Sequence, residues 1–198
     1  MDNRVTLLED EIVTRVQTAR YMLEKLGKPC DSLKLIKLIA LADIYKLRLE
    51  GETITGDDYV AMKNGPAPSN TSNIIRFNSD YVDGDTLTYA GNYIEKHNTT
   101  ISAKEGDVAY DYLSDFDKKC IDYVVEKYGN LSASDLTDGN GGENVHAFEA
   151  WKKHDIRAFG PGQVAPIHME DFFTNDGPVQ VDEADIERSR ERYLHGNL

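Results

Sequence analysis

The apolar residues at the start of the chain recur with the period of an α-helix. They form one stripe, which predicts an amphipathic helix: Ile12, Val16, Ala19, Leu23 and Leu26. Gly27 and Pro29 follow in the order that ends a helix. A second helix is predicted from a cap at Asp31 or Ser32 as far as Gly51, and it is apolar nearly all round. We expect it to lie in the middle of a domain and to pack with the first helix as a hairpin.

After the second helix the pattern becomes that of short β elements and turns. Thr55-Gly56-Asp57 predicts a turn, residues 59–63 predict a strand, and Asn64-Gly65-Pro66 ends that strand. Ser69 or Asn70 is then in place to cap a short helix.

Two further stretches predict strands. Leu87 and Tyr89 alternate with threonines, and residues 93–94 and 99–103 flank a turn at His97-Asn98. A small antiparallel hairpin or meander is therefore expected in this part of the chain.

Helical patterns return near residue 114. Ser114 and Asp117 form a capping-box pattern ahead of a helix that ends at Gly129, and residues 132–137 predict a short helical piece. Residues 138–142 read as a flexible loop.

Beyond this loop, Val145, Phe148 and Trp151 step by three and predict another helix. Residues 167–173 provide an apolar edge that we expect to dock onto the body of the protein.

The last segment, residues 182–194, begins with a capping-box-like pair, Asp182 and Asp185, but has few apolar residues. We expect this helix to lean on the rest of the protein. The whole pattern predicts a mainly α fold (α+β), a compact helical domain with a small antiparallel β hairpin or meander. Residues 1–175 are interpreted as the domain and residues 176–198 as a C-terminal helical tail.

Charge is distributed unevenly along the chain. The 198 residues include 22 Lys and Arg against 35 Asp and Glu, a net charge of −13, and the excess of acid lies after residue 50. Nucleic acid is an unexpected partner, because its binders normally carry a basic stripe. The acidic surface either serves solubility alone or steers basic partners inward.

The sequence also predicts the location of the protein. No apolar run is long enough to cross a membrane, and the N-terminus lacks the apolar region of a secretory signal. Cys30 and Cys120 are far apart in predicted helices, which favours buried reduced thiols over a disulfide. We therefore expect a soluble cytoplasmic protein without a membrane partner.

Residues 33–66 carry a specific motif. The helical part fits L-x-K-L-x-x-x-A-D at Leu35, Lys37, Leu38, Ala42 and Asp43. The part after it fits G-x-x-I-T-G-D-x-Y-V-A-M-x-x-G-P at Gly51, Ile54, Thr55, Gly56, Asp57, Tyr59, Val60, Ala61, Met62, Gly65 and Pro66. This motif resembles the signature of the Panacea domain, which defines a family of SocA-like antitoxins.

The second half of the chain supports the resemblance. Residues 127–129, 131–137 and 151–152 look like the C-terminal half of the family, so the resemblance covers roughly residues 10–175. The family commonly has a histidine after the position of Thr137, where this chain has Asp138 instead.

The resemblance implies a bacterial or phage antitoxin that neutralises a cognate protein toxin by direct contact, without catalysis and without a cofactor. Members of the family pair with unrelated toxins, so the resemblance does not identify the target. An adaptor that delivers the toxin to a protease is one alternative, and a metal-dependent hydrolase is another.

The best metal-site candidate is a cluster of five residues: Glu143, His146, Glu149, His154 and Asp155. His146 and Glu149 are three positions apart and would share one face of a helix. The other interpretation, an exposed polar face, is favoured by composition, and we expect no metal.

Two carboxylates of the motif are candidates for chemistry. Asp43 lies among apolar residues and needs a lysine or a backbone amide as partner, which favours a structural role over a catalytic acid. Asp57 and Asp58 could pair as general acid and base, but Asp57 and Thr55 are better suited to brace the turn. We therefore expect no catalytic residue.

The remaining candidates divide into structural and contact residues. Gly65 and Pro66 shape a corner of the chain, and Trp151 is either a core residue or an interface anchor. We interpret the following as structural residues of the motif: Asp43, Gly56, Asp57, Tyr59, Met62, Gly65 and Pro66. Lys63, Asn64 and Trp151 are the candidates for partner contact.

Overall fold

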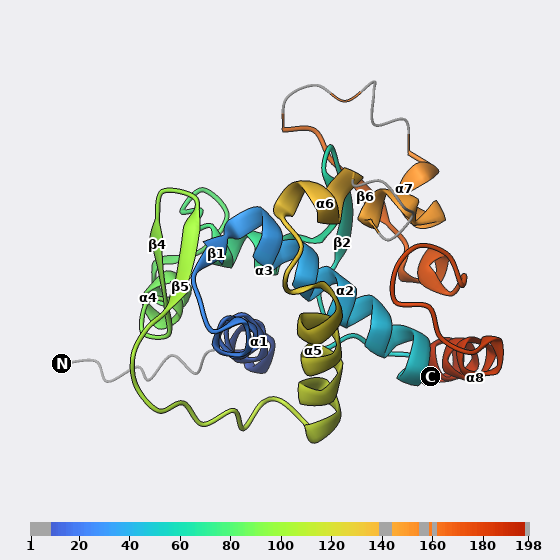
Figure 1. The fold of residues 1–198 in the computed structure, drawn as a ribbon, viewed down its shortest axis with the longest axis horizontal. Coiled ribbons are helices and arrows are strands. Elements are labelled where there is room, and N and C mark those ends of the chain that lie inside the picture. The colour runs from blue at the N-terminus through green and yellow to red at the C-terminus, as the bar shows by residue number, and fades with distance from the viewer. Residues whose placement is uncertain (1–8, 139–143, 155–158, 160–161, 197–198) are drawn as a thin grey trace.

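The computed structural model describes residues 9–138, 144–154, 159 and 162–196. Within these ranges the protein is mainly helical with two small antiparallel sheets of three strands, which confirms the predicted fold class. Figure 1 shows the other elements arranged around helix α2 (Ser32–Glu50), which crosses the middle of the molecule. No helix in the described part of the chain is long and apolar enough to cross a membrane.

Helices α1 (Asp10–Leu26) and α2 form the predicted pair. Asp31 caps α2, because its carboxylate accepts a hydrogen bond from the backbone N–H of Leu33. Helix α1 is buried on all sides between Arg15 and Leu23 and exposed at both ends, whereas α2 is covered along almost its entire length. The all-round apolar pattern therefore correctly placed α2 in the core.

The first sheet contains strands in the order β1 (Cys30–Asp31), β5 (Thr100–Ala103) and β4 (Ile94–His97). The hairpin of β4 and β5 was predicted, and its turn includes Asn98 at a positive φ of 57°. Cys30 lies in β1 and not in a helix, and both Cys30 and Cys120 are buried free thiols.

The strand predicted around Leu87 and Tyr89 is wrong, because these residues belong to helix α4 (Gly84–Ala90). The carboxylate of Asp83 accepts hydrogen bonds from the N–H and the hydroxyl of Thr86 and so caps the helix. This local cap outweighs the weak β preference of the alternating residues.

The second sheet contains strands in the order β3 (Gly65–Pro68), β2 (Tyr59–Met62) and β6 (Ala165–Ile167). Met62 pairs with Gly65, so Lys63 and Asn64 form a two-residue turn. The predicted stop at Gly65-Pro66 is therefore the start of a second strand. Strand β6 was not predicted, because it reaches the sheet from about a hundred residues away in the sequence.

Three predicted helices lie along the middle of the chain. They are α3 (Ser69–Ile75), α5 (Asp115–Tyr128) and α6 (Ala133–Asp138). The capping box of Ser114 and Asp117 at the start of α5 is confirmed in both directions. The predicted loop at residues 138–142 lies mostly outside the described residues.

The single helix predicted through Val145, Phe148 and Trp151 is wrong. The chain forms a 3-10 turn, η1 (Val145–Ala147), and a short helix, α7 (Glu149–Lys152), separated by Phe148 in an extended conformation. The break allows the Phe148 ring to enter the core, where it packs edge-on against Phe172.

The C-terminal region packs against α2. The 3-10 turn η3 (Met169–Phe172) is followed by helix α8 (Glu183–His195), whose Ser189 hydroxyl donates to the carbonyl of Arg48. The predicted capping box at Asp182 is absent, because this side chain accepts no cap hydrogen bond. The boundary at residue 175 stays a prediction, and contacts cross it.

Candidate functional site

Asp43 lies at the centre of the motif and is fully buried in α2. Its carboxylate accepts hydrogen bonds from the N–H groups of Ile54 (2.9 Å) and Thr55 (3.1 Å). The hydroxyls of Thr55 (2.5 Å) and Tyr59 (2.9 Å) donate to the other oxygen. Burial raises the pKa of Asp43 to about 6, and the hydrogen bonds oppose this shift. Of the two partners that the sequence allowed for Asp43, a lysine or a backbone amide, the structure shows backbone amides, together with two hydroxyls.

Lys37 lies about one and a half turns before Asp43 on α2 and connects this helix to strand β3. Its ammonium group is buried and donates to the carbonyls of Gly65 (3.2 Å) and Pro66 (2.7 Å). No ion pair to Lys37 is found in the described ranges, and burial lowers its pKa to about 7, with a further contribution from the charge of Arg76. Lys37 and Asp43 therefore join the two halves of the sequence motif through buried polar contacts.

Asp57 holds the start of α3. Its carboxylate accepts hydrogen bonds from the N–H and side-chain amide of Asn70 and from the N–H and hydroxyl of Thr71. The prediction that Asp57 braces its own turn is wrong, since its partners lie 13 and 14 residues further on. Asp58 is exposed while Asp57 is buried, so the two carboxylates do not face a common site.

Gly56 and Tyr59 complete this part of the motif. Gly56 has a positive φ of 57°, and its carbonyl accepts a hydrogen bond from the guanidinium of Arg15. Tyr59 is buried, and its ring packs edge-on against Phe172. The motif residues thus fix the path of the chain from α2 into the second sheet.

The β2–β3 hairpin is clamped by the η1–α7 segment. The indole N–H of Trp151 donates to the carbonyl of Met62 (2.8 Å), and the Trp151 ring stacks on His146 at 4.1 Å between centroids. Gly65 has a φ of 96°, and a Cβ at this position would lie 2.4 Å from a methyl carbon of Val145. Gly65 is therefore required both by its conformation and by the close approach of η1.

The three residues predicted for partner contact meet at this hairpin. Lys63 and Asn64 are exposed in its turn, and Trp151 is half-buried beside it. The hairpin is held rigidly at its base by Lys37 and at its side by Trp151. A rigid, exposed turn is well suited to contact another molecule.

The described members of the candidate metal cluster do not form a metal site. Glu143 and Asp155 lie outside the described residues, and Glu149 pairs with Lys152. His146 is occupied by the stack on Trp151, and burial lowers its pKa. Among the residues that the structure describes, no three His, Cys, Asp or Glu side chains are arranged to hold a metal ion.

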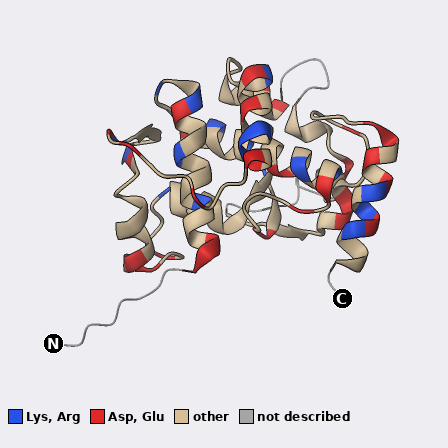
Figure 2. Cartoon of the chain, turned by 90° about the horizontal axis from the view of Figure 1, so that it is seen from below, with Lys and Arg blue, Asp and Glu red and all other residues tan. Residues whose placement is uncertain are grey.

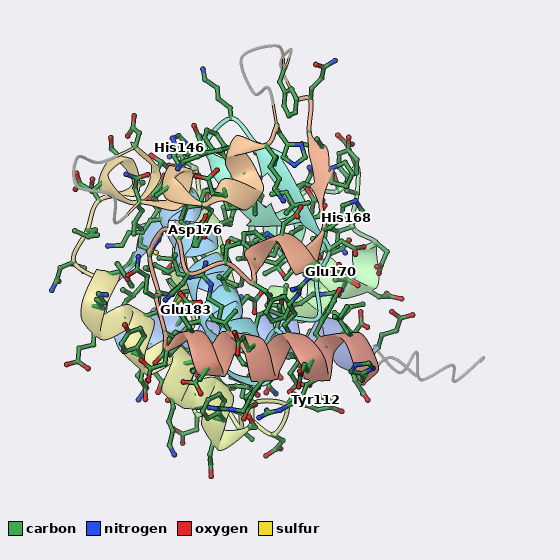
Figure 3. All side chains as sticks on the ribbon, turned by 90° about the vertical axis from the view of Figure 1, so that its right-hand side faces the viewer. Tyr112, His146, His168, Glu170, Asp176 and Glu183 are labelled. Atoms are coloured by element: carbon green, nitrogen blue, oxygen red, sulfur yellow. The ribbon has the colours of Figure 1, made fainter. Side chains whose placement is uncertain are left out.

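Arg48 is a key structural residue that the sequence reasoning missed. Its buried guanidinium donates to four carbonyls and one carboxylate, all from the C-terminal region: those of Phe172, Pro178, Val179 and Asp176, and the Asp176 side chain. Burial lowers the pKa of Arg48 to about 10. Figure 3 looks onto this side, where α8 crosses in front and Asp176 lies above it. The sequence signal that could have revealed this role is an arginine within a helix that is apolar nearly all round.

More basic than acidic side chains are buried in the described part of the molecule. Six basic and three acidic side chains are buried in the described part, and Arg15, Arg20 and Lys34 donate to backbone carbonyls as Lys37 does. The exposed surface is consequently more acidic than the total charge suggests. Figure 2 shows Asp and Glu spread over several elements of the surface.

Fold and site together define a small α+β protein in which a sequence motif ties one buried helix to an exposed hairpin. The model of the antitoxin SocA-like family, Panacea domain, matches residues 35–152, and the chain belongs to this family. The match begins within α2 and ends with α7. No curated protein and no solved structure matches the chain significantly.

Proposed function

We propose that this protein is the antitoxin of a toxin–antitoxin system and neutralises a cognate protein toxin in the cytoplasm by binding it directly. The observation that supports this most is the family match, which covers the motif around Lys37 and Asp43. The buried charges of this motif all have structural partners, which is the pattern of a binding scaffold. No cofactor is part of the proposal.

Within this proposal the β2–β3 hairpin contributes to the contact surface. Lys63 and Asn64 stand exposed on a turn fixed from two sides, so little conformational entropy is lost when they bind. Trp151 is partly exposed beside them and provides the kind of aromatic anchor that dominates interfaces.

The decisive experiment expresses this protein together with the product of each gene adjacent to its own. We expect one neighbour to arrest growth when expressed alone, and the arrest to be relieved by this protein. The two should then co-purify through size-exclusion chromatography. A neighbour whose toxicity persists, or no complex despite relief, would contradict direct neutralisation.

Two further measurements separate this mechanism from the other candidates. Relief that survives deletion of the host proteases supports sequestration, whereas relief that needs one protease points to an adaptor. An Asp43→Asn or His146→Ala variant that stays folded should still relieve the arrest, because neither side chain has a catalytic task in this proposal.

A further inference from the structure

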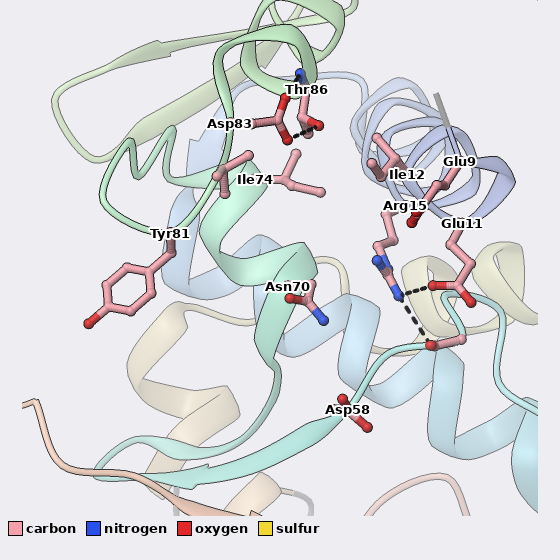
Figure 4. A pocket seen from close by; sticks show the side chains of 12 residues that line it. Glu9, Glu11, Ile12, Arg15, Asp58, Asn70, Ile74, Tyr81, Asp83 and Thr86 are labelled. Atoms are coloured by element: carbon pink, nitrogen blue, oxygen red, sulfur yellow. Dashed lines mark hydrogen bonds and ion pairs between the residues drawn. The ribbon is translucent and has the colours of Figure 1, made fainter. Parts of the chain in front are cut away.

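Tyr81 lies between two pockets that differ in charge. Its side chain is 77% exposed and lines both of them. Figure 4 shows the first pocket, with the Tyr81 ring pointing away from the other labelled side chains. An aromatic side chain this exposed contributes little to folding and is available for contact with another molecule.

The first pocket is rich in carboxylates. It has a volume of ≈ 520 Å³ and lies between the start of α1, the turn before β2 and the start of α4. Four acidic residues line it: Glu9, Glu11, Asp58 and Asp83. Arg15, the one arginine among the described lining residues, is already bonded to Glu11 and to the carbonyl of Gly56. The pocket is therefore negative and suits a basic side chain.

Among the described residues, no carboxylate lines the second pocket. It has a volume of ≈ 310 Å³ and lies between the outer side of β2, helix α3 and the residues that precede β6. Val60 and Met62 from β2 and Val164 form its apolar part, and Arg76 is its only ionised residue. A pocket without acid is unexpected in a chain with 35 Asp and Glu against 22 Lys and Arg.

Two polar side chains of the second pocket make no hydrogen bond to the described residues. The buried hydroxyl of Ser72, a residue 3% exposed, has no hydrogen-bond partner there. The half-buried guanidinium of Arg76 makes no hydrogen bond or ion pair with a described residue, and the charge of Asp31 acts on it only from a distance. Ser72 and Arg76 are four positions apart and share one face of α3. Asn73 uses its side-chain oxygen to accept from Asn78, which leaves its amide N–H groups to donate.

These groups can all donate hydrogen bonds, and they line one small pocket. A carboxylate suits the half-buried guanidinium best, because it can accept two parallel N–H bonds. The charge of Arg76 contributes to lowering the pKa of Lys37, so the two cations are close, and the carboxylate of Asp31 offsets part of their positive potential. The second pocket is thus prepared for an acidic group.

We propose that the surface on both sides of Tyr81 binds one segment of the partner toxin, with an Asp or Glu side chain seated on Arg76 and a Lys or Arg side chain in the carboxylate pocket. The exposed Tyr81 and Val164 provide the apolar contact of this surface. Met62 connects it to the hairpin, because its side chain lines the second pocket and its carbonyl receives Trp151. This inference rests on the proposed function and specifies where the toxin docks.

The first test measures the affinity of the purified complex by biolayer interferometry. We expect Arg76→Glu to raise Kd by about 100-fold and Tyr81→Ala by about 10-fold, in the range of interface anchors. Arg190→Glu, the same charge change at an exposed site on α8, should leave Kd within about twofold. A toxin variant with one Asp or Glu changed to Arg should restore binding to Arg76→Glu. Equal Kd values for Arg76→Glu and Arg190→Glu would overturn the inference.

Two further measurements are made on the unmodified protein, so they do not require that a variant folds; a variant serves only as a control. Hydrogen exchange of residues 72–82 should slow on complex formation, and unchanged exchange there would count against the surface. NMR of the backbone amides of residues 72–78 during titration with sodium acetate should show binding with Kd on the order of 10 mM, lost in Arg76→Ala. A submillimolar Kd for inorganic phosphate, with no effect of acetate, would assign the pocket to a free anion instead.

The outcomes separate this inference from the function on which it rests. If no neighbouring protein is neutralised, the proposed function fails, and the acetate titration still decides whether Arg76 receives a carboxylate. If a toxin binds normally to Arg76→Glu and Tyr81→Ala, the function stands and the docking surface is elsewhere.

Discussion

Three buried charged side chains connect the central helix to other parts of the chain. Lys37, Asp43 and Arg48 all belong to one helix, yet each is satisfied by a different part of the chain. The need of Asp43 for a partner could be predicted, because its neighbours are apolar. The acceptors of Lys37 and Arg48 could not be, because they are backbone carbonyls, which carry no sequence signal and lie 28 to 131 residues away.

The buried ammonium of Lys37 leads to a prediction about pH. Its pKa is lowered to about 7 in the folded protein, so between this value and its ordinary pKa near 10.5 the unfolded chain binds more protons. Lys37 therefore destabilises the folded protein below pH 7, and this stability is recovered as the pH rises above 7. Between about pH 7 and pH 9 we expect a gain on the order of 2–3 kcal/mol from Lys37 alone.

Urea unfolding of the wild type and of Lys37→Met across this range measures the effect. The difference between the two free energies of unfolding should change with pH by the stated amount. Lys119→Met, at an exposed position, serves as the control and should follow the wild type. Parallel pH profiles for wild type and Lys37→Met would refute the assignment.

At the scale of elements, periodicity predicted the long helices and failed for the short ones. Helix α4 is too short to show a period, so the alternation of Leu87 and Tyr89 was read as a strand. The extended Phe148 divides what looked like one helical stripe. Strand β6 joins β2 through tertiary contacts alone, which a local pattern cannot reveal.

The turn before β2 and the β2–β3 hairpin offer a matched pair of glycine substitutions. Gly56 and Gly65 both have positive φ, but only Gly65 has a neighbour, Val145, in the space of a Cβ. Gly56→Ala should cost about 1 kcal/mol from backbone strain alone. Gly65→Ala should cost a further 1–3 kcal/mol or so, because η1 must move. Thermal unfolding compares the two, and equal losses would show that the contact with Val145 is unimportant.

At the scale of the whole molecule, Arg48 attaches the C-terminal region to the central helix. Replacement with Met keeps most of the volume but leaves the carbonyls of Phe172, Pro178 and Val179 without their donor. We expect a loss of about 3 kcal/mol or more in stability. Hydrogen exchange should accelerate over residues 169–195 before it does in α5. Arg190→Met is the control, and uniform acceleration throughout the chain would contradict a local attachment.

The acidic surface has a kinetic consequence for binding. Glu9 and Asp58 are exposed and line the carboxylate pocket, and their side chains make no hydrogen bond to the described residues. Changing both to Lys should slow association with a basic toxin by about tenfold at low salt and weaken the salt dependence. The control places the same charges on α8 with Glu187→Lys and Glu191→Lys. An association rate that is equal in both variants would indicate that the acidic surface serves solubility only.

The attachment through Arg48 also sets an order of events during synthesis. The ribosome completes α2 more than a hundred residues before the chain segment that supplies the acceptors of its arginine. Until residue 179 has emerged, the most buried helix of the protein lacks its cover on one side. Translation that stops before this point therefore leaves an incomplete core, which chaperones must shield and proteases can remove.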